Sequence, residues 1–349
     1  MITQHFKGSG HKIFSSFERQ FGALMKFIIL LLFIFLSLTQ AKAQYPKLLI
    51  QLKDKGNNTF SLSNASQFLS PRAIQRRTRF NIPIDSADLP VTPRYIDSIR
   101  LAGNVTVLST SKWLNQVLIQ STDQTAVSKI QSLPFVRLVQ SIGLRTINNA
   151  IVERFKEDVI PLEPSVQTNH QRKAADYYDY GNSYNQVHIH EGEFLHNKGY
   201  RGENMQIAVL DAGFLQYKTI TAFDSIRINA QVLGERDFVA FDNSVNEDNS
   251  HGMYCLSILS ANWRGRMVGT APKSKYWLIR TENAGTEYPV EEHNWVAGAE
   301  FADSTGSDMI SSSLGYSEFD DPSFNHSYND FYKNTTMVSR GASIAAKKE

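Results

Sequence analysis

The hydrophobic and polar positions of residues 45–142 predict a small α+β domain. Four short runs rich in apolar and β-branched residues predict strands, at 45–52, 105–108, 116–120 and 135–139. Ser70 and Pro71 predict a helix start, because serine caps helices and proline tolerates the first helical position. Apolar positions three to four residues apart predict a second helix over 126–133. Turn residues are expected to punctuate the middle of the domain, at Pro90, Pro93 and Gly103.

From residue 186 onward, predicted strands and helices alternate. Mostly apolar runs predict strands, at 205–210, 276–280 and 309–312. Helical spacing predicts helices, at 251–260, 290–303 and 337–348. Ser250 is the predicted N-cap of the first helix, and Gly306 is the stop signal after the second. The alternation predicts a parallel sheet with crossover helices, in which functional groups gather at the carboxyl ends of the strands. The polar residues 143–185 predict a linker or an exposed segment.

The N-terminus has the pattern of an export signal. Lys26 precedes ten consecutive apolar residues, and Ala41-Lys42-Ala43 follows them. This order predicts a secretory signal peptide over 25–43, cleaved after Ala43, with residues 1–24 as an upstream extension. The apolar run is short for a membrane span, which needs about 20 residues, although an uncleaved anchor is the alternative. We therefore expect a secreted, periplasmic or cell-surface protein without a stable membrane span.

Charge is distributed unevenly along the 349 residues, although the net charge is only +2. Residues 44–150 carry 13 basic and 5 acidic side chains, whereas residues 186–349 carry 14 basic and 22 acidic ones. The basic residues are scattered rather than clustered, which argues against nucleic-acid binding. Opposite charge on the two regions indicates that they could bind each other. The single cysteine excludes an internal disulfide and any multi-cysteine zinc site.

Two short motifs bear candidate catalytic side chains. Asp211 follows the apolar run 207–210 and precedes a turn of small residues, where an aspartate either caps the turn or orients another group. His251 begins a predicted helix, whose positive end disfavours the imidazolium and so favours a neutral, proton-accepting ring. Gly252 would let another backbone or a ligand approach closely. Cys255, one helical turn after His251, is interpreted as an inert buried residue.

These motifs resemble those of the subtilisin-like serine peptidases, family S8, in which the aspartate precedes the histidine along the chain. Gly269-Thr270-Ala271-Pro272 is similar to the family's G-x-A-P turn, and Ser313-Leu314-Gly315 to its S-L-G substrate strand. The resemblance implies an α/β fold, a subtilisin-like parallel sheet with flanking helices, preceded by a small α+β propeptide-like domain.

The resemblance also implies roles for these residues. Asp211 would orient His251, and His251 would act as general base and then as general acid. The backbone of Ser313, Leu314 and Gly315 would pair with an extended peptide or protein substrate. Met253 and Tyr254 depart from the family's H-G-T-H motif, which changes the packing around His251 without removing the base.

The family's serine motif, G-T-S-x-[AS]-x-P, does not occur after residue 315. The N-x-x-G-N-like strand that supplies an oxyanion-hole asparagine does not occur there either. We therefore expect residues 186–349 to be an incomplete, N-terminal part of a catalytic domain. Because an Asp–His pair without serine cannot form an acyl-enzyme, we predict no peptidase activity for these 349 residues.

Residues 44–142 are similar to the N-terminal region of secreted subtilases of the Bacteroidetes group. The similarity is carried by Ser66–Arg77, Asp88-Leu89-Pro90-Val91, Tyr95 and Ser111-Lys112-Trp113-Leu114-Asn115. It implies a propeptide that chaperones folding and blocks the cleft of its own enzyme through an intramolecular contact.

Two other classes of function stay open. His188, His190 and His196, with Glu191 and Glu193 among them, could form a metal site if residues 188–190 were a strand. A non-catalytic inhibitor or chaperone of related subtilases is the other alternative, because the serine is missing. No cofactor is predicted, since no dinucleotide or phosphate-binding glycine motif follows a strand, and a structural calcium ion is left open.

Overall fold

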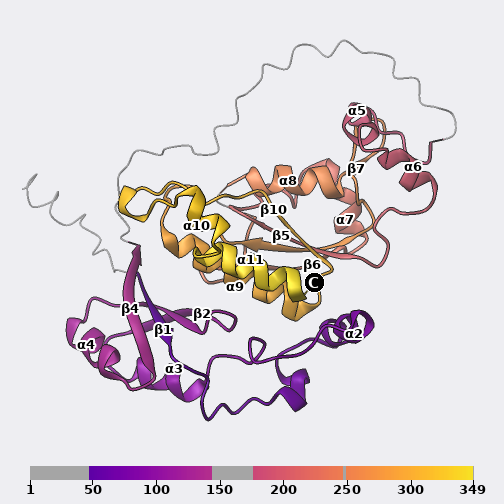
Figure 1. Cartoon of the computed structure of the whole chain (residues 1–349). Helices are drawn as coiled ribbons and strands as arrows, with labels where there is room; N and C mark the ends of the chain where they lie inside the picture. The colour runs from indigo at the N-terminus through magenta and orange to yellow at the C-terminus, as the bar shows by residue number, and fades with distance from the viewer. Residues whose placement is uncertain (1–46, 144–175, 247–248, 349) are drawn as a thin grey trace, which may run out of the picture. The chain divides into compact units, whose positions relative to one another are not determined.

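The computed structural model describes residues 47–143, 176–246 and 249–348 (Figure 1). The predicted upstream extension, the signal peptide and most of the predicted linker lie outside these residues. Within the described part of the chain, no helix is both long enough and apolar enough to cross a membrane.

The N-terminal α+β domain is built on a four-stranded antiparallel sheet in the order β2-β3-β1-β4. Its strands are β1 (Lys47–Leu52), β2 (Thr106–Ser111), β3 (Gln116–Gln120) and β4 (Val136–Gly143). Helices α3 (Pro93–Arg100) and α4 (Gln124–Ser132) cover one face of the sheet. Alternate strand residues pack there against Tyr95, Ile99 and Ile130, while Leu49 and Leu118 belong to a second cluster on the other face. The central strands are therefore covered on both faces.

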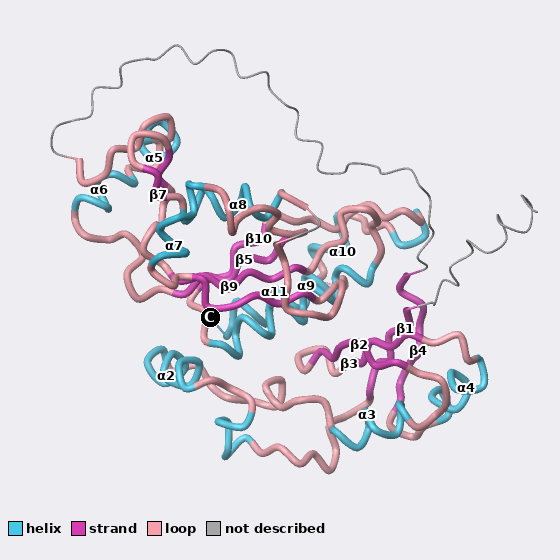
Figure 2. The backbone as a smooth tube through the Cα atoms, turned by 180° about the vertical axis from the view of Figure 1, so that it is seen from behind, coloured by secondary structure: helices cyan, strands magenta, loops and turns pink. Residues whose placement is uncertain are grey.

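The C-terminal region contains a four-stranded parallel sheet in the order β10-β5-β9-β6. Its strands are β5 (Gln206–Asp211), β6 (Val232–Asp237), β9 (Lys275–Arg280) and β10 (Met309–Ser312). Helix α8 (His251–Ser260) lies on one face, and α9 (Pro289–Thr305) and α11 (Met337–Lys348) lie on the other (Figure 2). Residues of β5 alternate between these two cores, since Ile207 and Val209 face α8 whereas Ala208 and Leu210 face α9. The predicted α/β fold, a parallel sheet with flanking helices that follows an α+β domain in the sequence, is confirmed.

Shorter elements connect these layers. The remaining helices are α2 (Pro71–Phe80), α5 (Tyr184–His188), α6 (Gly192–Asn197), α7 (Asp224–Ile228) and α10 (Tyr328–Tyr332). A small hairpin pairs β7 (Asn262–Trp263) with β8 (Met267–Val268), and short 3₁₀ turns span 62–67, 221–223 and 322–324.

Three local predictions were wrong. Pro93 does not mark a turn but is the first residue of α3, a position where the missing proline N–H costs nothing. His188 ends helix α5, so no strand places it beside His190. Residues 176–185 are not an exposed linker throughout, because Tyr180 is buried with Val187 and Val268, and Gly181 pairs with Met267.

Candidate active site

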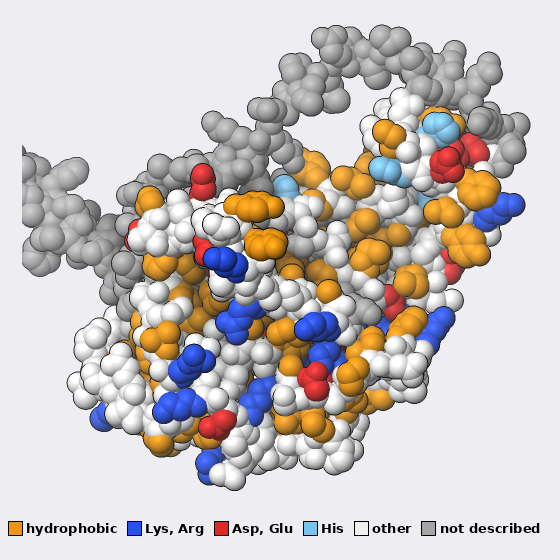
Figure 3. Space-filling view, in the orientation of Figure 1, with side chains coloured by type: hydrophobic (Ala, Val, Ile, Leu, Met, Phe, Trp, Pro, Cys, Tyr) orange, Lys and Arg blue, Asp and Glu red, His pale blue; other side chains and the backbone are white. Residues whose placement is uncertain are grey.

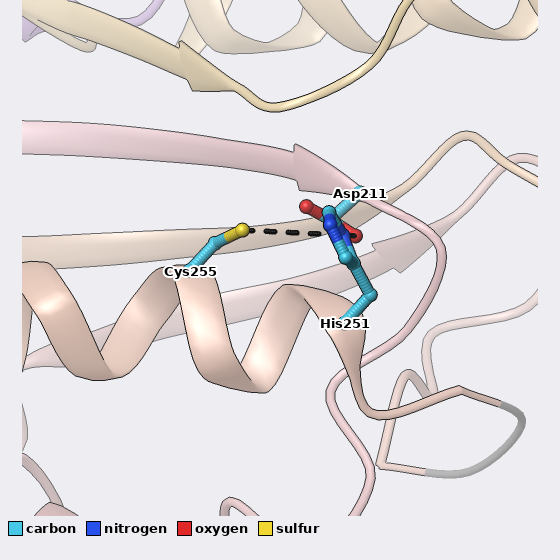
Figure 4. Close-up of side chains that lie close together, drawn as sticks. All are labelled: Asp211, His251 and Cys255. Atoms are coloured by element: carbon cyan, nitrogen blue, oxygen red, sulfur yellow. Dashed lines mark hydrogen bonds and ion pairs between the residues drawn. The ribbon is translucent and has the colours of Figure 1, made fainter. Parts of the chain in front are cut away.

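Asp211 and His251 form a hydrogen-bonded pair at the carboxyl edge of the parallel sheet (Figure 4). Asp211 is the last residue of β5 and is fully buried, and His251 is the first residue of α8. The distance between His251 Nδ1 and Asp211 Oδ1 is 2.7 Å, and the Ala212 N–H donates to the same oxygen at 2.7 Å. A carboxylate on Nδ1 favours the tautomer that carries its proton there and directs Nε2 to accept one.

Close packing of α8 against β5 brings the pair together. A Cβ on Gly252 would lie 2.5 Å from the Gly213 carbonyl oxygen and 2.7 Å from the Asp211 Cβ, so the predicted close approach is confirmed. Asn249 caps the helix, since its Oδ1 accepts a hydrogen bond from the His251 N–H at 2.7 Å. Ser250 occupies the predicted N-cap position, without a side-chain cap hydrogen bond.

Cys255 lies beside the pair but is not poised as a nucleophile. Its Sγ is 3.9 Å from His251 Nδ1. Burial raises the pKa of the thiol to about 11, so the side chain stays neutral at physiological pH. Because the thiolate is the reactive form, this cysteine is a poor substitute for a serine.

The predicted substrate-binding segment reaches the same edge of the sheet. Strand β10 pairs with β5 in parallel, with Ser312 opposite Leu210, so Ser313–Gly315 follow where Asp211 ends its strand. Ser313 and Gly315 are exposed, and a Cβ on Gly315 would meet no atom within 4 Å. Leu314 packs against the core beneath. The segment therefore presents open backbone beside the Asp211–His251 pair.

Two of the three histidines considered for a metal site, His188 and His196, bind other groups. His188 pairs with Glu193, while buried His196 donates from Nε2 to the Thr270 carbonyl oxygen at 3.0 Å and meets the Tyr180 hydroxyl at 2.7 Å through Nδ1. Figure 3 shows histidine and acidic side chains gathered around α5 and α6. Among the described residues, however, the groups of side chains close enough to share an ion do not include these histidines.

The two domains meet through buried polar contacts that the sequence did not single out. Glu300 on α9 accepts hydrogen bonds from the Ser111 hydroxyl at 2.6 Å and from the Lys112 and Trp113 N–H groups at 2.8 and 3.0 Å. Burial raises the pKa of Glu300. The loop between β2 and β3 also inserts Trp113 and Leu114 into the core beside α9.

Ion pairs with the expected signs reinforce this interface. Arg76 and Arg77 of α2 each lie 2.8 Å or less from the carboxylate of Asp303 on α9, and all three side chains are buried. Arg77 also pairs with Asp88 at 2.9 Å. The predicted attraction between a basic N-terminal region and an acidic C-terminal one is confirmed at these contacts. One ion pair has the opposite arrangement of charges: Lys348 of the C-terminal region has its Nζ 2.8 Å from Asp88 of the N-terminal domain.

Comparison with known proteins agrees with both halves of this description. The family model for the peptidase S8 propeptide domain of Bacteroidota matches residues 47–157. Subtilisin from Bacillus pumilus is 30% identical over 125 residues, which cover 35% of this chain and 41% of that protein. Subtilisin E from Bacillus subtilis is 27% identical over 174 residues, which cover 49% of this chain and 41% of that protein. The chain is similar to the subtilisin-like S8 peptidases.

The chain spans about 41% of the length of the curated subtilisins that it matches. Its N-terminal α+β domain is an S8 propeptide domain. Among solved structures, fervidolysin from Fervidobacterium pennivorans aligns over 88% of this chain and 39% of its own, with a TM-score of 0.47 and 16% identity.

Proposed function

We propose that this chain supplies the aspartate and histidine of a secreted subtilisin-like serine endopeptidase. The pair of buried Asp211 and partly exposed His251, 2.7 Å apart at the carboxyl edge of a parallel sheet, carries this proposal. The similarity to subtilisins supports it, since that family uses an Asp–His–Ser triad in this chain order.

In the proposed mechanism, His251 accepts the proton of the serine hydroxyl as the serine attacks the carbonyl carbon of the peptide bond. The amine leaves with the proton that His251 returns to it, and a water molecule then hydrolyses the acyl-enzyme in the same way. Asp211 stays ionised, stabilises the imidazolium and keeps the ring oriented. Ser313–Gly315 would hold an extended peptide or protein substrate by adding it as a strand.

Residues 1–349 contain no serine in the family's nucleophile motif, so we propose that they do not hydrolyse peptides by themselves. Labelling of the purified chain with a serine-directed fluorophosphonate tests this, with Subtilisin E as the positive control. We expect no labelling of this chain under conditions that label the control stoichiometrically. Stoichiometric labelling of residues 1–349 would contradict the proposal and would show which serine acts.

The S8 propeptide domain is proposed to chaperone and to inhibit its own peptidase. The buried acceptors Glu300 and Asp303 support this role, because they hold the domain against α9. Export through the predicted signal peptide at 25–43 is part of the same proposal.

A second candidate function is inhibition of related subtilases by this domain in trans. The observation that favours it is that the domain has a core of its own, built from its sheet and from α3 and α4. Residues 44–150 added to a full-length relative should inhibit peptide hydrolysis, and less strongly at high salt if charge attraction contributes. No inhibition at any salt concentration would exclude this second function.

A further inference from the structure

One segment of the S8 propeptide domain, between β1 and α3, has a small apolar cluster of its own. We call residues 61–82, which comprise a 3₁₀ turn and helix α2, the arm. Ala65, Leu69 and Ala73 form its cluster, which is separate from the core of the sheet, α3 and α4. Figures 1 and 2 both show α2 standing apart from that sheet. The position of the arm is therefore set by contacts outside the core of its own domain.

Helix α9 ends beside the arm with two backbone carbonyls that its own C-terminal turn does not pair. The last four carbonyls of an α-helix have no partner within the helix. In α9 the N–H groups that follow the helix, at Gly306 and Ser307, bind the first two of these carbonyls. The other two, which belong to Ser304 and Thr305, are left for donors from elsewhere.

Ser70 of the arm supplies both donors. Its N–H donates to the Ser304 carbonyl oxygen at 2.9 Å, and its hydroxyl donates to the Thr305 carbonyl oxygen at 2.9 Å. The same hydroxyl oxygen accepts the Ala73 N–H at 3.1 Å, so Ser70 also caps the start of α2. The positive end of α2 therefore faces the negative end of α9, an arrangement that the two helix dipoles favour.

Arg72 extends this cap into the turn that leads from α9 to β10. Its Nε donates to the Gly306 carbonyl oxygen at 3.0 Å, and its Nη2 donates to the Asn204 carbonyl oxygen at 2.9 Å and to the carboxylate of Asp308. Asp308 accepts the Gln206 N–H at 2.8 Å and donates its own N–H to the Gln206 carbonyl oxygen at 2.8 Å. One arginine therefore joins the end of α9 to the starts of β5 and β10.

The charges of the arm and of this helix end are complementary. The last turn of α9 has no basic residue, which would suit the dipole, and it contains Asp303 instead. Arg76 and Arg77 of the arm bring the positive charge to that carboxylate. The fit is close, because a Cβ on Gly306 would lie 2.7 Å from the Ala73 backbone nitrogen. The arm thus supplies both the donors and the charge that the end of α9 lacks.

We propose that the arm is the C-terminal cap of α9 and that, through this cap, the propeptide domain directs folding of the α9–β10 crossover. The inference rests on the proposed chaperone role of the domain and assigns that role to Ser70 and Arg72. Parallel strands need a long crossover, and such non-local pairing forms slowly because the loop must close first. A capped end of α9 places β10 beside β5, in the register that sets Ser312 opposite Leu210.

Hydrogen–deuterium exchange of the full chain, read by mass spectrometry, tests the cap. We expect Arg72→Ala to raise exchange roughly tenfold in peptides that cover residues 303–312, because the end of α9 loses donors and opens locally. Arg79→Ala is the matched control, since Arg79 is exposed on the same helix with its guanidinium over the Phe80 ring. Alanine favours helices, so neither substitution weakens α2 itself. Equal exchange of residues 303–312 in the two variants would overturn the proposal.

A second variant, Ser70→Asp, separates the two caps that Ser70 makes. An aspartate can still accept the Ala73 N–H and cap α2, but its carboxylate has no proton to donate to the Thr305 carbonyl oxygen. Exchange of residues 303–312 should therefore rise as it does in Arg72→Ala. A rise confined to residues 71–80 would contradict the cap on α9.

Refolding after dilution from urea, followed by tryptophan fluorescence, tests the role in folding. Arg72→Ala and Ser70→Asp should refold several-fold more slowly than the wild type and Arg79→Ala. Glu300→Gln, at a contact outside the arm, distinguishes two failures. If only Glu300→Gln slows refolding, the domain assists folding without the arm, and this inference is overturned. If no variant slows refolding, the proposed chaperone role is overturned with it.

Discussion

The two ends of helix α9 bury acidic side chains in opposite ways. Near its C-terminus, Glu300 and Asp303 are met by hydroxyl, backbone N–H and guanidinium donors of the S8 propeptide domain. Near its N-terminus, Glu291 faces two other glutamates and has a buried oxygen without a donor.

The helix dipole alone would favour acids at the N-terminal end and disfavour them at the C-terminal end. Glu291 at the N-terminal end nevertheless has fewer hydrogen-bond donors than Glu300 and Asp303 at the C-terminal end, although its neighbour Glu292 pairs with His326. The acids that oppose the dipole are therefore compensated by donors of the N-terminal domain, whereas Glu291, which suits the dipole, lies among other acids.

The largest expected loss of stability comes from removing the carboxylate of Asp303, near the C-terminus of α9. Asp303→Asn leaves Arg76 and Arg77 buried without their shared carboxylate, which typically lowers the free energy of unfolding by about 3–5 kcal/mol. Urea denaturation of the full chain measures this change. Asp308→Asn is the control, because Asp308 pairs with a partly exposed Arg72 and should change the stability by only about 0–1 kcal/mol. Equal effects of the two substitutions would show that burial does not distinguish these ion pairs.

A smaller loss is expected at Glu300. Glu300→Ala leaves three buried donors of Ser111, Lys112 and Trp113 without their acceptor, at a cost of roughly 3 kcal/mol. Glu300→Gln keeps one acceptor oxygen and should cost less. The same denaturation assay ranks the two variants, and a glutamine variant less stable than the alanine variant would contradict this account of the interface.

Titration of His293, which lies between the two ends of α9, should produce the smallest effect. Burial first, and then Lys47, lower its pKa to about 4, and its Nε2 lies 3.0 Å from the Ser109 hydroxyl of β2. When the domains separate or unfold, its pKa returns to about 6.5, so the separated state binds more protons below that pH. The interface should therefore lose stability as the pH falls from about 6.5 toward 4.

The raised pKa of Glu300 acts in the opposite direction, because burial makes the docked state hold this proton more tightly than the separated state does. The contribution of His293 is therefore isolated by subtracting the pH profile of His293→Gln from that of the wild type. If the two profiles of unfolding free energy run parallel between pH 6.5 and 4, His293 does not contribute.

The sequence predicted regular elements better than it predicted this interface. The strand at 116–120 and the helix at 251–260 matched their observed bounds, because apolar periodicity and turn residues act locally. Strand β6 was not predicted, because Gly234, Glu235 and Arg236 make its sequence too polar to indicate a strand. Its strand conformation depends on pairing with β9. The order of the motifs along the sequence predicted that Asp211, His251 and Ser313–Gly315 belong to one site.

Long-range partners explain what could not be predicted. The Arg76–Arg77 run is typical of a solvated helix face, yet both side chains are buried because Asp303, more than two hundred residues later, pairs with them. Glu282, Glu287 and Glu291 are likewise close only because the end of β9 folds back onto α9. Neither partnership has a local sequence signal.

The central claim is that Asp211 holds His251 in the tautomer of a catalytic base. Proton NMR of the histidine-labelled chain at low temperature tests it most directly, through the resonance of the His251 Nδ1 proton. The account predicts a strongly downfield Nδ1 resonance in the wild type, its loss in Asp211→Asn and its retention in Cys255→Ser. A spectrum that Asp211→Asn leaves unchanged would contradict the pairing and, with it, the proposed function.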